Sequence, residues 1–133
     1  MTRYLVSSVT AWMAIFLLGV EIALPYFLRR VRMVAASGMS ISLRERLKPH
    51  YWIGYALAAL STVHGSSVGP AMARSDLAGI WAATVAWGLI FVQVALGLLL
   101  QNGGANTQRV RRAHFWSMAA LSGLITVHVW RNG

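Results

Sequence analysis

The chain has 133 residues, of which 57% are hydrophobic and 11% are charged, whereas a soluble domain carries about 25% charged residues. The absence of cysteine excludes disulfides, thiolate metal sites and cysteine-ligated iron–sulfur clusters. A formal net charge of +9 would suggest nucleic acid in a soluble protein, but here the basic residues lie between apolar segments, so we expect no nucleic-acid partner.

Four apolar stretches come close to the roughly 20 residues that an α-helix needs to cross a bilayer. Backbone groups cannot stay unpaired in lipid, so each stretch should be helical. The expected helices cover residues 4–28, 50–68, 77–100 and 114–130. The sequence therefore predicts an all-α membrane protein: one domain over residues 1–133, folded as an up-down bundle of four transmembrane helices in membrane lipid.

Basic residues concentrate in two of the three connections. Six lysines and arginines lie in residues 29–49 and three in residues 101–113, whereas the middle connection holds only Arg74. The positive-inside rule places both basic loops in the cytoplasm and both termini outside, in the cell (inner) membrane. The first apolar run is longer than that of a signal peptide and its positive cluster follows it, so we expect an uncleaved, N-out helix.

Four histidines form two pairs with the same spacing. His50 and His64 are 14 residues apart, and so are His114 and His128. This spacing is about 21 Å of α-helix and just under four turns, so both members of a pair face nearly the same way. Ionisable residues inside a bilayer are costly and usually mark function.

An internal repeat surrounds these histidines. The segment HYWIGYALAALSTVH, from His50 to His64, matches HFWSMAALSGLITVH, from His114 to His128, at eight of fifteen positions. Both histidines and a tryptophan align. The second and fourth helices run parallel in an up-down bundle, so we expect His50 to meet His114 and His64 to meet His128.

Two facing imidazoles at each of two depths are the axial ligands for two stacked, six-coordinate b-type haems. Zinc or copper would need closer ligands and further donors around one metal. A lone membrane histidine is often only hydrogen-bonded or part of a proton relay, so a haem-free anchor or proton-relaying transporter is the alternative of another class. Candidate contacts for the haem propionates are the basic residues at the rims: Lys48, Arg109, Arg111 and Arg112 inside, and Arg74 and Arg131 outside.

The chain resembles the di-haem four-helix core of cytochrome b from quinol:cytochrome c oxidoreductases, and also small cytochrome b membrane subunits of dehydrogenases. The resemblance rests on the four paired histidines, His50, His64, His114 and His128. The resemblance implies axial ligation of haem iron by these four residues and electron exchange with quinone. The long carboxy-terminal half of that family is missing, together with its Pro-Glu-Trp-Tyr motif. The paired glycines of its first and third helices are not clearly kept.

Two polar residues are candidates for a quinone site. Glu21 is the only acid within an expected span, and Gln93 lies on the third helix. Both fall near the level of His50 and His114, where a carboxylate could exchange protons with quinol. The structural alternative is that Glu21 pairs with Arg29 or Arg32, or caps a helix break near Pro25.

These patterns predict transmembrane electron transfer through two bis-histidine haems. We expect an electron-transfer subunit of a larger oxidoreductase, because the segments outside the helices are too short for a flavin, pterin or iron–sulfur domain. A catalytic or electron-carrier partner subunit should complete it. The rival within the same class is a stand-alone transmembrane reductase of ferric ion or superoxide.

Overall fold

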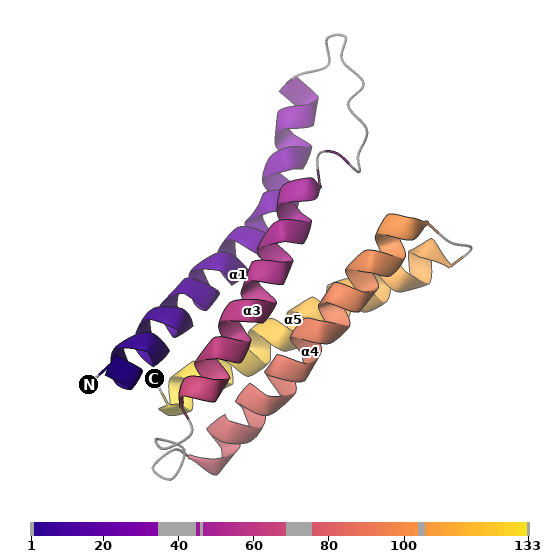
Figure 1. The fold of residues 1–133 in the computed structure, drawn as a ribbon. Coiled ribbons are helices and arrows are strands. Elements are labelled where there is room, and N and C mark those ends of the chain that lie inside the picture. The colour runs from indigo at the N-terminus through magenta and orange to yellow at the C-terminus, as the bar shows by residue number, and fades with distance from the viewer. Residues whose placement is uncertain (1, 35–44, 46, 69–75, 104–105, 133) are drawn as a thin grey trace.

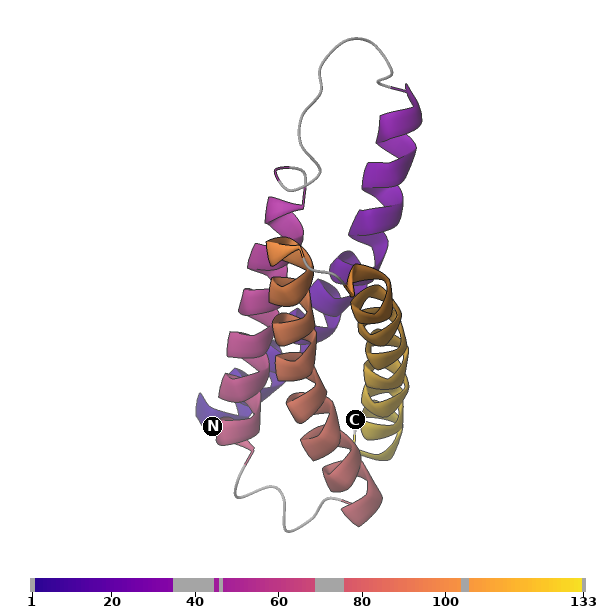
Figure 2. The ribbon, with the colours of Figure 1, turned by 90° about the vertical axis from the view of Figure 1, so that its right-hand side faces the viewer.

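The computed structural model describes residues 2–34, 45, 47–68, 76–103 and 106–132. Within these ranges the protein is all-helical and has no strand. Its four long helices are α1 (Thr2–Val34), α3 (Lys48–Ser67), α4 (Leu77–Asn102) and α5 (Thr107–Asn132). The chain passes up and down through them in order, and both termini lie at the same end (Figures 1 and 2). Four helices are what the apolar stretches predicted.

The helices begin and end where local chemistry allows. Pro49 lies in the first turn of α3, where its missing N–H is not needed. The Asp76 carboxylate accepts a hydrogen bond from the Gly79 amide (3.4 Å) and caps α4. Gly103 follows α4 with φ of 63°, a conformation that glycine adopts without strain.

Two helices are longer than the apolar runs predicted. α1 continues through Pro25 to Val34, and α5 begins seven residues before His114, at Thr107. The helix predicted over residues 4–28 thus runs through Pro25, and the alternative that Glu21 caps a helix break there is wrong. The axis of α1 does bend (Figure 2), as an internal proline favours. Hydropathy marks only the apolar part of a helix, whereas arginine is itself a good helix former. The basic residues expected in loops thus partly lie on helix ends: Arg29, Arg30, Arg32, Arg109, Arg111 and Arg112.

The helices pack as two hairpins. α1 lies along α3, α4 lies along α5, and α3 joins the hairpins by contact with α4, whereas the backbones of α3 and α5 hardly approach one another. The small core draws on all four helices: Leu18 from α1, Leu57 from α3, Ala86 and Ile90 from α4, and Leu121 from α5. Leu57 and Leu121 are equivalent positions of the internal repeat, so the repeat places matching side chains at the centre of the bundle.

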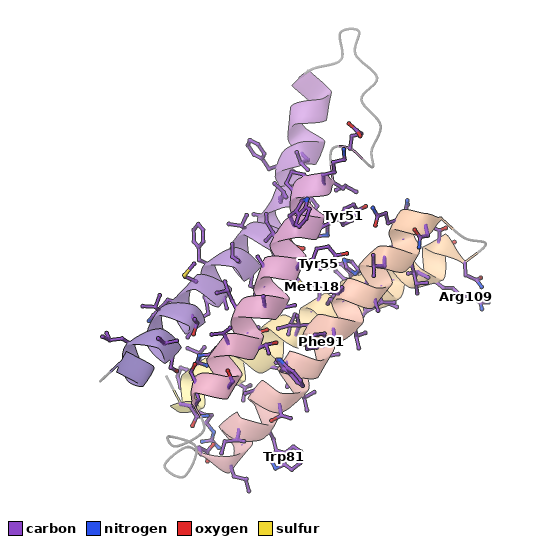
Figure 3. All side chains as sticks on the ribbon, viewed as in Figure 1. Tyr51, Tyr55, Trp81, Phe91, Arg109 and Met118 are labelled. Carbon is purple, nitrogen blue, oxygen red and sulfur yellow. The ribbon has the colours of Figure 1, made fainter. Side chains whose placement is uncertain are left out.

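Many large apolar side chains face outward. Trp12 is 67% exposed, Phe16 70% and Trp81 63%, and Trp81 projects from the lower end of α4 in Figure 3. Two helical segments, Leu5–Leu28 and Leu77–Asn102, are long and apolar enough to cross a membrane by length and composition, and most of each lies outside the core. The chain thus carries apolar surface that its own fold does not cover.

Candidate functional site

The four histidines come together in two pairs between α3 and α5. The ring centroids of His50 and His114 are 6.2 Å apart, and those of His64 and His128 are 6.4 Å apart. The planes within each pair are nearly perpendicular, at 75° and 73°. We call His50 and His114 the inner pair, and His64 and His128 the outer pair, after the predicted topology. The pairing arises because parallel helices bring equivalent repeat positions to the same height.

The Nδ1 atoms of the outer pair face groups on the two other helices. His64 Nδ1 lies 3.0 Å from the Ser7 carbonyl oxygen on α1, and His128 Nδ1 lies 3.1 Å from the Gly79 carbonyl oxygen on α4. Because carbonyl oxygens only accept, each contact requires the proton on Nδ1 and leaves Nε2 as an acceptor or metal ligand. The four Nε2 atoms have no hydrogen-bond partner within the described part of the chain.

The inner pair has different neighbours. Glu21 Oε1 on α1 lies 3.0 Å from His50 Nδ1, although the alignment falls short of a hydrogen bond. The His114 Nδ1 atom is buried without a partner among the described residues. Gln93 is fixed nearby, because its Nε2 donates to the His114 carbonyl oxygen (3.0 Å) and to Ser117 Oγ (2.9 Å).

A hollow with about 570 Å³ of empty space, part of it open to the surroundings, adjoins the inner pair. All four helices line the hollow, and Tyr51, Tyr55 and Met118 on its wall lie between the hairpins (Figure 3).

Unpaired polar atoms gather at this hollow. Buried polar groups are nearly always hydrogen-bonded, so an orphaned one needs an explanation. Five buried side-chain atoms in the described residues lack a partner, and four of them belong to residues that line the hollow: Glu21 Oε2, His50 Nδ1, Gln93 Oε1 and His114 Nδ1. This clustering makes the hollow the candidate binding site of the described bundle.

The structure therefore brings Glu21 and Gln93 to the level of the inner pair. The alternative pairing of Glu21 with Arg29 or Arg32 stays a prediction, because the structure describes only the backbone of these two arginines. Side-chain patterns in the sequence do not reveal the neighbours of the ring nitrogens. Two are backbone carbonyl oxygens, which every residue type has. The third is Glu21, which the sequence predicted as a quinone residue or an arginine partner and not as a neighbour of His50.

The basic residues are less uniform than the sequence suggested. Lys48 pairs with Glu45 at 2.8 Å, and Arg131 pairs with Asp76 at 3.1 Å, so both have acidic partners at the rims. Arg109 points away from the bundle (Figure 3), and it is exposed together with Arg111 and Arg112. Arg74 lies outside the described residues.

Each pair offers two donors to a metal rather than a complete cage. No group of three or more histidine, aspartate and glutamate side chains gathers in the described residues. A structural zinc ion usually takes four protein ligands, whereas haem iron takes four nitrogens from its macrocycle and needs only two axial ligands.

The spacing within each pair suits such an ion. With metal–imidazole bonds of about 2 Å and roughly 1.1 Å from nitrogen to ring centre, the two centroids should lie about 6 Å apart. The observed 6.2 and 6.4 Å fit this requirement.

Comparison with known proteins gives no independent assignment: no protein-family model, curated protein or solved structure matches the chain.

Proposed function

We propose that the protein is a di-haem b-type cytochrome of the cell membrane that passes electrons between the two sides of the bilayer. The observation that carries the proposal is the approach of the histidines in the inner and outer pairs. Their ring centroids are 6.2 and 6.4 Å apart, although the backbones of α3 and α5 hardly approach one another. Three further buried atoms at the inner hollow, Glu21 Oε2, Gln93 Oε1 and His114 Nδ1, have no partner among the described residues and support a bound group there.

The membrane setting of the proposal is supported by the surface. A core helix of a soluble protein is mostly buried, but the most apolar windows of α1 and α4 are only 17% and 11% buried. Exposed tryptophan and phenylalanine side chains would be costly in water and suit lipid. All four helices would cross the bilayer, with both termini outside and residues 29–49 and 101–113 on the cytoplasmic side.

Under this proposal the chain's own residues hold and orient the cofactors. His50 and His114 would ligate one iron, and His64 and His128 the other, each through Nε2. The Ser7 and Gly79 carbonyl oxygens would hold the outer rings in the required tautomer. When bound, haem supplies one-electron chemistry at iron. With two histidines of this chain holding each iron, no position would be left for oxygen, so the bound group would favour electron transfer over oxygen chemistry.

We further propose quinone as an exchange partner at the inner level and a partner subunit as the other redox partner. The unpaired oxygens Glu21 Oε2 and Gln93 Oε1 are acceptors, which suit the hydroxyl groups of a quinol. A quinol analogue should reduce the protein's haem, and Glu21→Ala should slow that reduction. Unchanged reduction in the variant would remove Glu21 from this role. Failure of the quinol analogue to reduce the wild-type haem would instead favour a stand-alone reductase of ferric ion or superoxide.

The decisive experiment is the haem content of the purified protein. We expect a b-type reduced-minus-oxidised spectrum, a low-spin bis-histidine signature in electron paramagnetic resonance, and about two haems per chain by pyridine haemochrome. A variant with alanine at all four histidines is the control and should bind none. Wild-type protein without the spectrum, produced in cells that supply haem to another b-type cytochrome, would end the proposal and leave a haem-free anchor or proton relay.

A further inference from the structure

The inner and outer pairs differ in the charge next to their ligands. Glu21 Oε1 lies 3.0 Å from His50 Nδ1, with the Glu21 side chain 9% exposed and that of His50 17% exposed. Gly54 on α3 lies beside this carboxylate, since a Cβ added at Gly54 would be 3.4 Å from Glu21 Oε1, an ordinary contact distance. An acidic side chain is thus packed directly against one ligand of the inner pair.

Among the side chains that the structure describes, no acidic group touches the outer pair. His64 and His128 face the neutral carbonyl oxygens of Ser7 and Gly79. Asp76 and Arg131, two charged side chains that the structure describes at that end, are 3.1 Å from each other and about half exposed, so their charges largely cancel and are screened. The two ligand sets are chemically alike, but their surroundings are not.

A carboxylate beside a ligating imidazole has a definite electrostatic effect. Iron in its ferric state carries one positive charge more than in its ferrous state, so a nearby negative charge stabilises the ferric state and lowers the midpoint potential. The effect is larger in a buried site, where the effective dielectric constant is low. A carboxylate partner also makes the imidazole a stronger donor to the metal, in the same sense.

We infer that Glu21 is a positioning and tuning residue that gives the inner haem the lower midpoint potential, so that the first electron to enter the protein rests at the outer pair. This inference depends on the proposed function, because it presupposes haem at both levels. An electron moving from the inner to the outer level oxidises ferrous iron at the first and reduces ferric iron at the second, with no proton or bond change. At equilibrium the electron favours the side of the bilayer nearer the termini.

The test uses single-haem backgrounds so that each level is measured alone. His64→Ala leaves the inner haem, and His50→Ala leaves the outer one. Potentiometric titration in detergent, without quinone, should give a lower midpoint for the His64→Ala protein. Adding Glu21→Gln, which keeps the size and an acceptor oxygen but removes the charge, should raise that midpoint. In the His50→Ala background the same substitution should leave the midpoint unchanged, because the outer level is about 21 Å away.

The outcomes separate this inference from the proposed function. If both single-haem proteins bind haem but Glu21→Gln shifts neither midpoint, or shifts both equally, the inference is wrong and the di-haem proposal stands. Absence of haem in the wild-type protein would instead remove the proposed function. Glu21→Asp keeps the charge, so its midpoint should stay closer to that of the parent than to that of Glu21→Gln. If the Glu21→Gln protein binds no haem, the Glu21→Asp protein provides the test. Because Glu21→Asp keeps the negative charge, an inner midpoint potential well above that of the parent would contradict the inference.

Discussion

The inner and outer histidine pairs lie on the same two helices and belong to the same repeat, yet they have different neighbours. At the outer pair, α1 and α4 each contribute a backbone carbonyl to a ring nitrogen. At the inner pair, α1 contributes a carboxylate, and α4 contributes Gln93, which binds the His114 carbonyl rather than its ring. The comparison teaches that α3 and α5 define where ligands lie, whereas α1 and α4 determine how the two levels differ.

Removing one histidine should have the largest effect, because it should abolish haem binding at one level and leave the other level intact. His128→Ala should abolish the outer haem and spare the inner one, and His114→Ala should do the reverse, so that about one haem per chain remains in each case. Pyridine haemochrome content is the measurement. Phe115→Leu, at an exposed neighbour of His114, is the control and should keep both haems. Loss of neither haem in His128→Ala would overturn the pairing.

Gly79→Ala should disturb the outer pair alone. An added Cβ would overlap the Asn132 side chain, which must move aside, and would lie 3.1 Å from Arg131 Cβ. We therefore expect α4 and α5 to separate by a few tenths of an ångström beside the Gly79 carbonyl that faces His128. We expect a loss of about 1–3 kcal/mol of stability and weaker outer haem binding, measured by thermal unfolding in detergent and by haem retention. Gly88→Ala is the matched control on α4, because its Cβ would meet nothing within 4 Å. Equal effects of the two variants would refute this explanation.

Gln93→Ala should weaken the inner level by a smaller amount. The substitution removes two hydrogen bonds from Gln93 Nε2, to the His114 carbonyl and to Ser117 Oγ. Both acceptors keep other partners, since Ser117 Oγ also donates to the Ala113 carbonyl, so the loss should be on the order of 1 kcal/mol. Thermal unfolding measures it, and Ser122→Ala, whose hydroxyl binds only its own helix backbone, is the comparison. If Gln93→Ala lost more outer haem than inner haem, Gln93 would not be a residue that supports the inner pair.

The smallest effect is expected outside the bundle, at Glu45. Lys48, 2.8 Å away, lowers the pKa of Glu45 from its ordinary value of 4.5 through a hydrogen bond and then through its charge. Because the pKa of Glu45 is lower in the folded state, the ion pair stabilises that state at pH values above the ordinary pKa of 4.5. This contribution disappears as the pH falls through the lowered pKa. Lys48→Met should move the pKa of Glu45 upward in an NMR titration. A pKa that stays low would assign the shift to another neighbour.

Much of the fold could be predicted because its signals are local. The length of each apolar run predicted a helix, and all four helices are present. Their ends could not be read from hydropathy, because α1 and α5 continue through arginine-rich turns where the pattern changes but helix propensity does not. The depth of Glu21 and Gln93 followed from counting residues along their helices, but contact between Glu21 and His50 depends on how α1 is rotated against α3.

By itself, the sequence determined the four helices, the two matched histidine pairs and their separation along the axis, because a helix rises by a constant 1.5 Å per residue. The tertiary structure alone decided which atoms lie against each ring nitrogen. Two of these partners are the carbonyl oxygens of Ser7 and Gly79, present in every residue type and therefore invisible in a pattern of side chains. The third, the carboxylate of Glu21, acquires its place beside His50 only when two helices distant in sequence pack together.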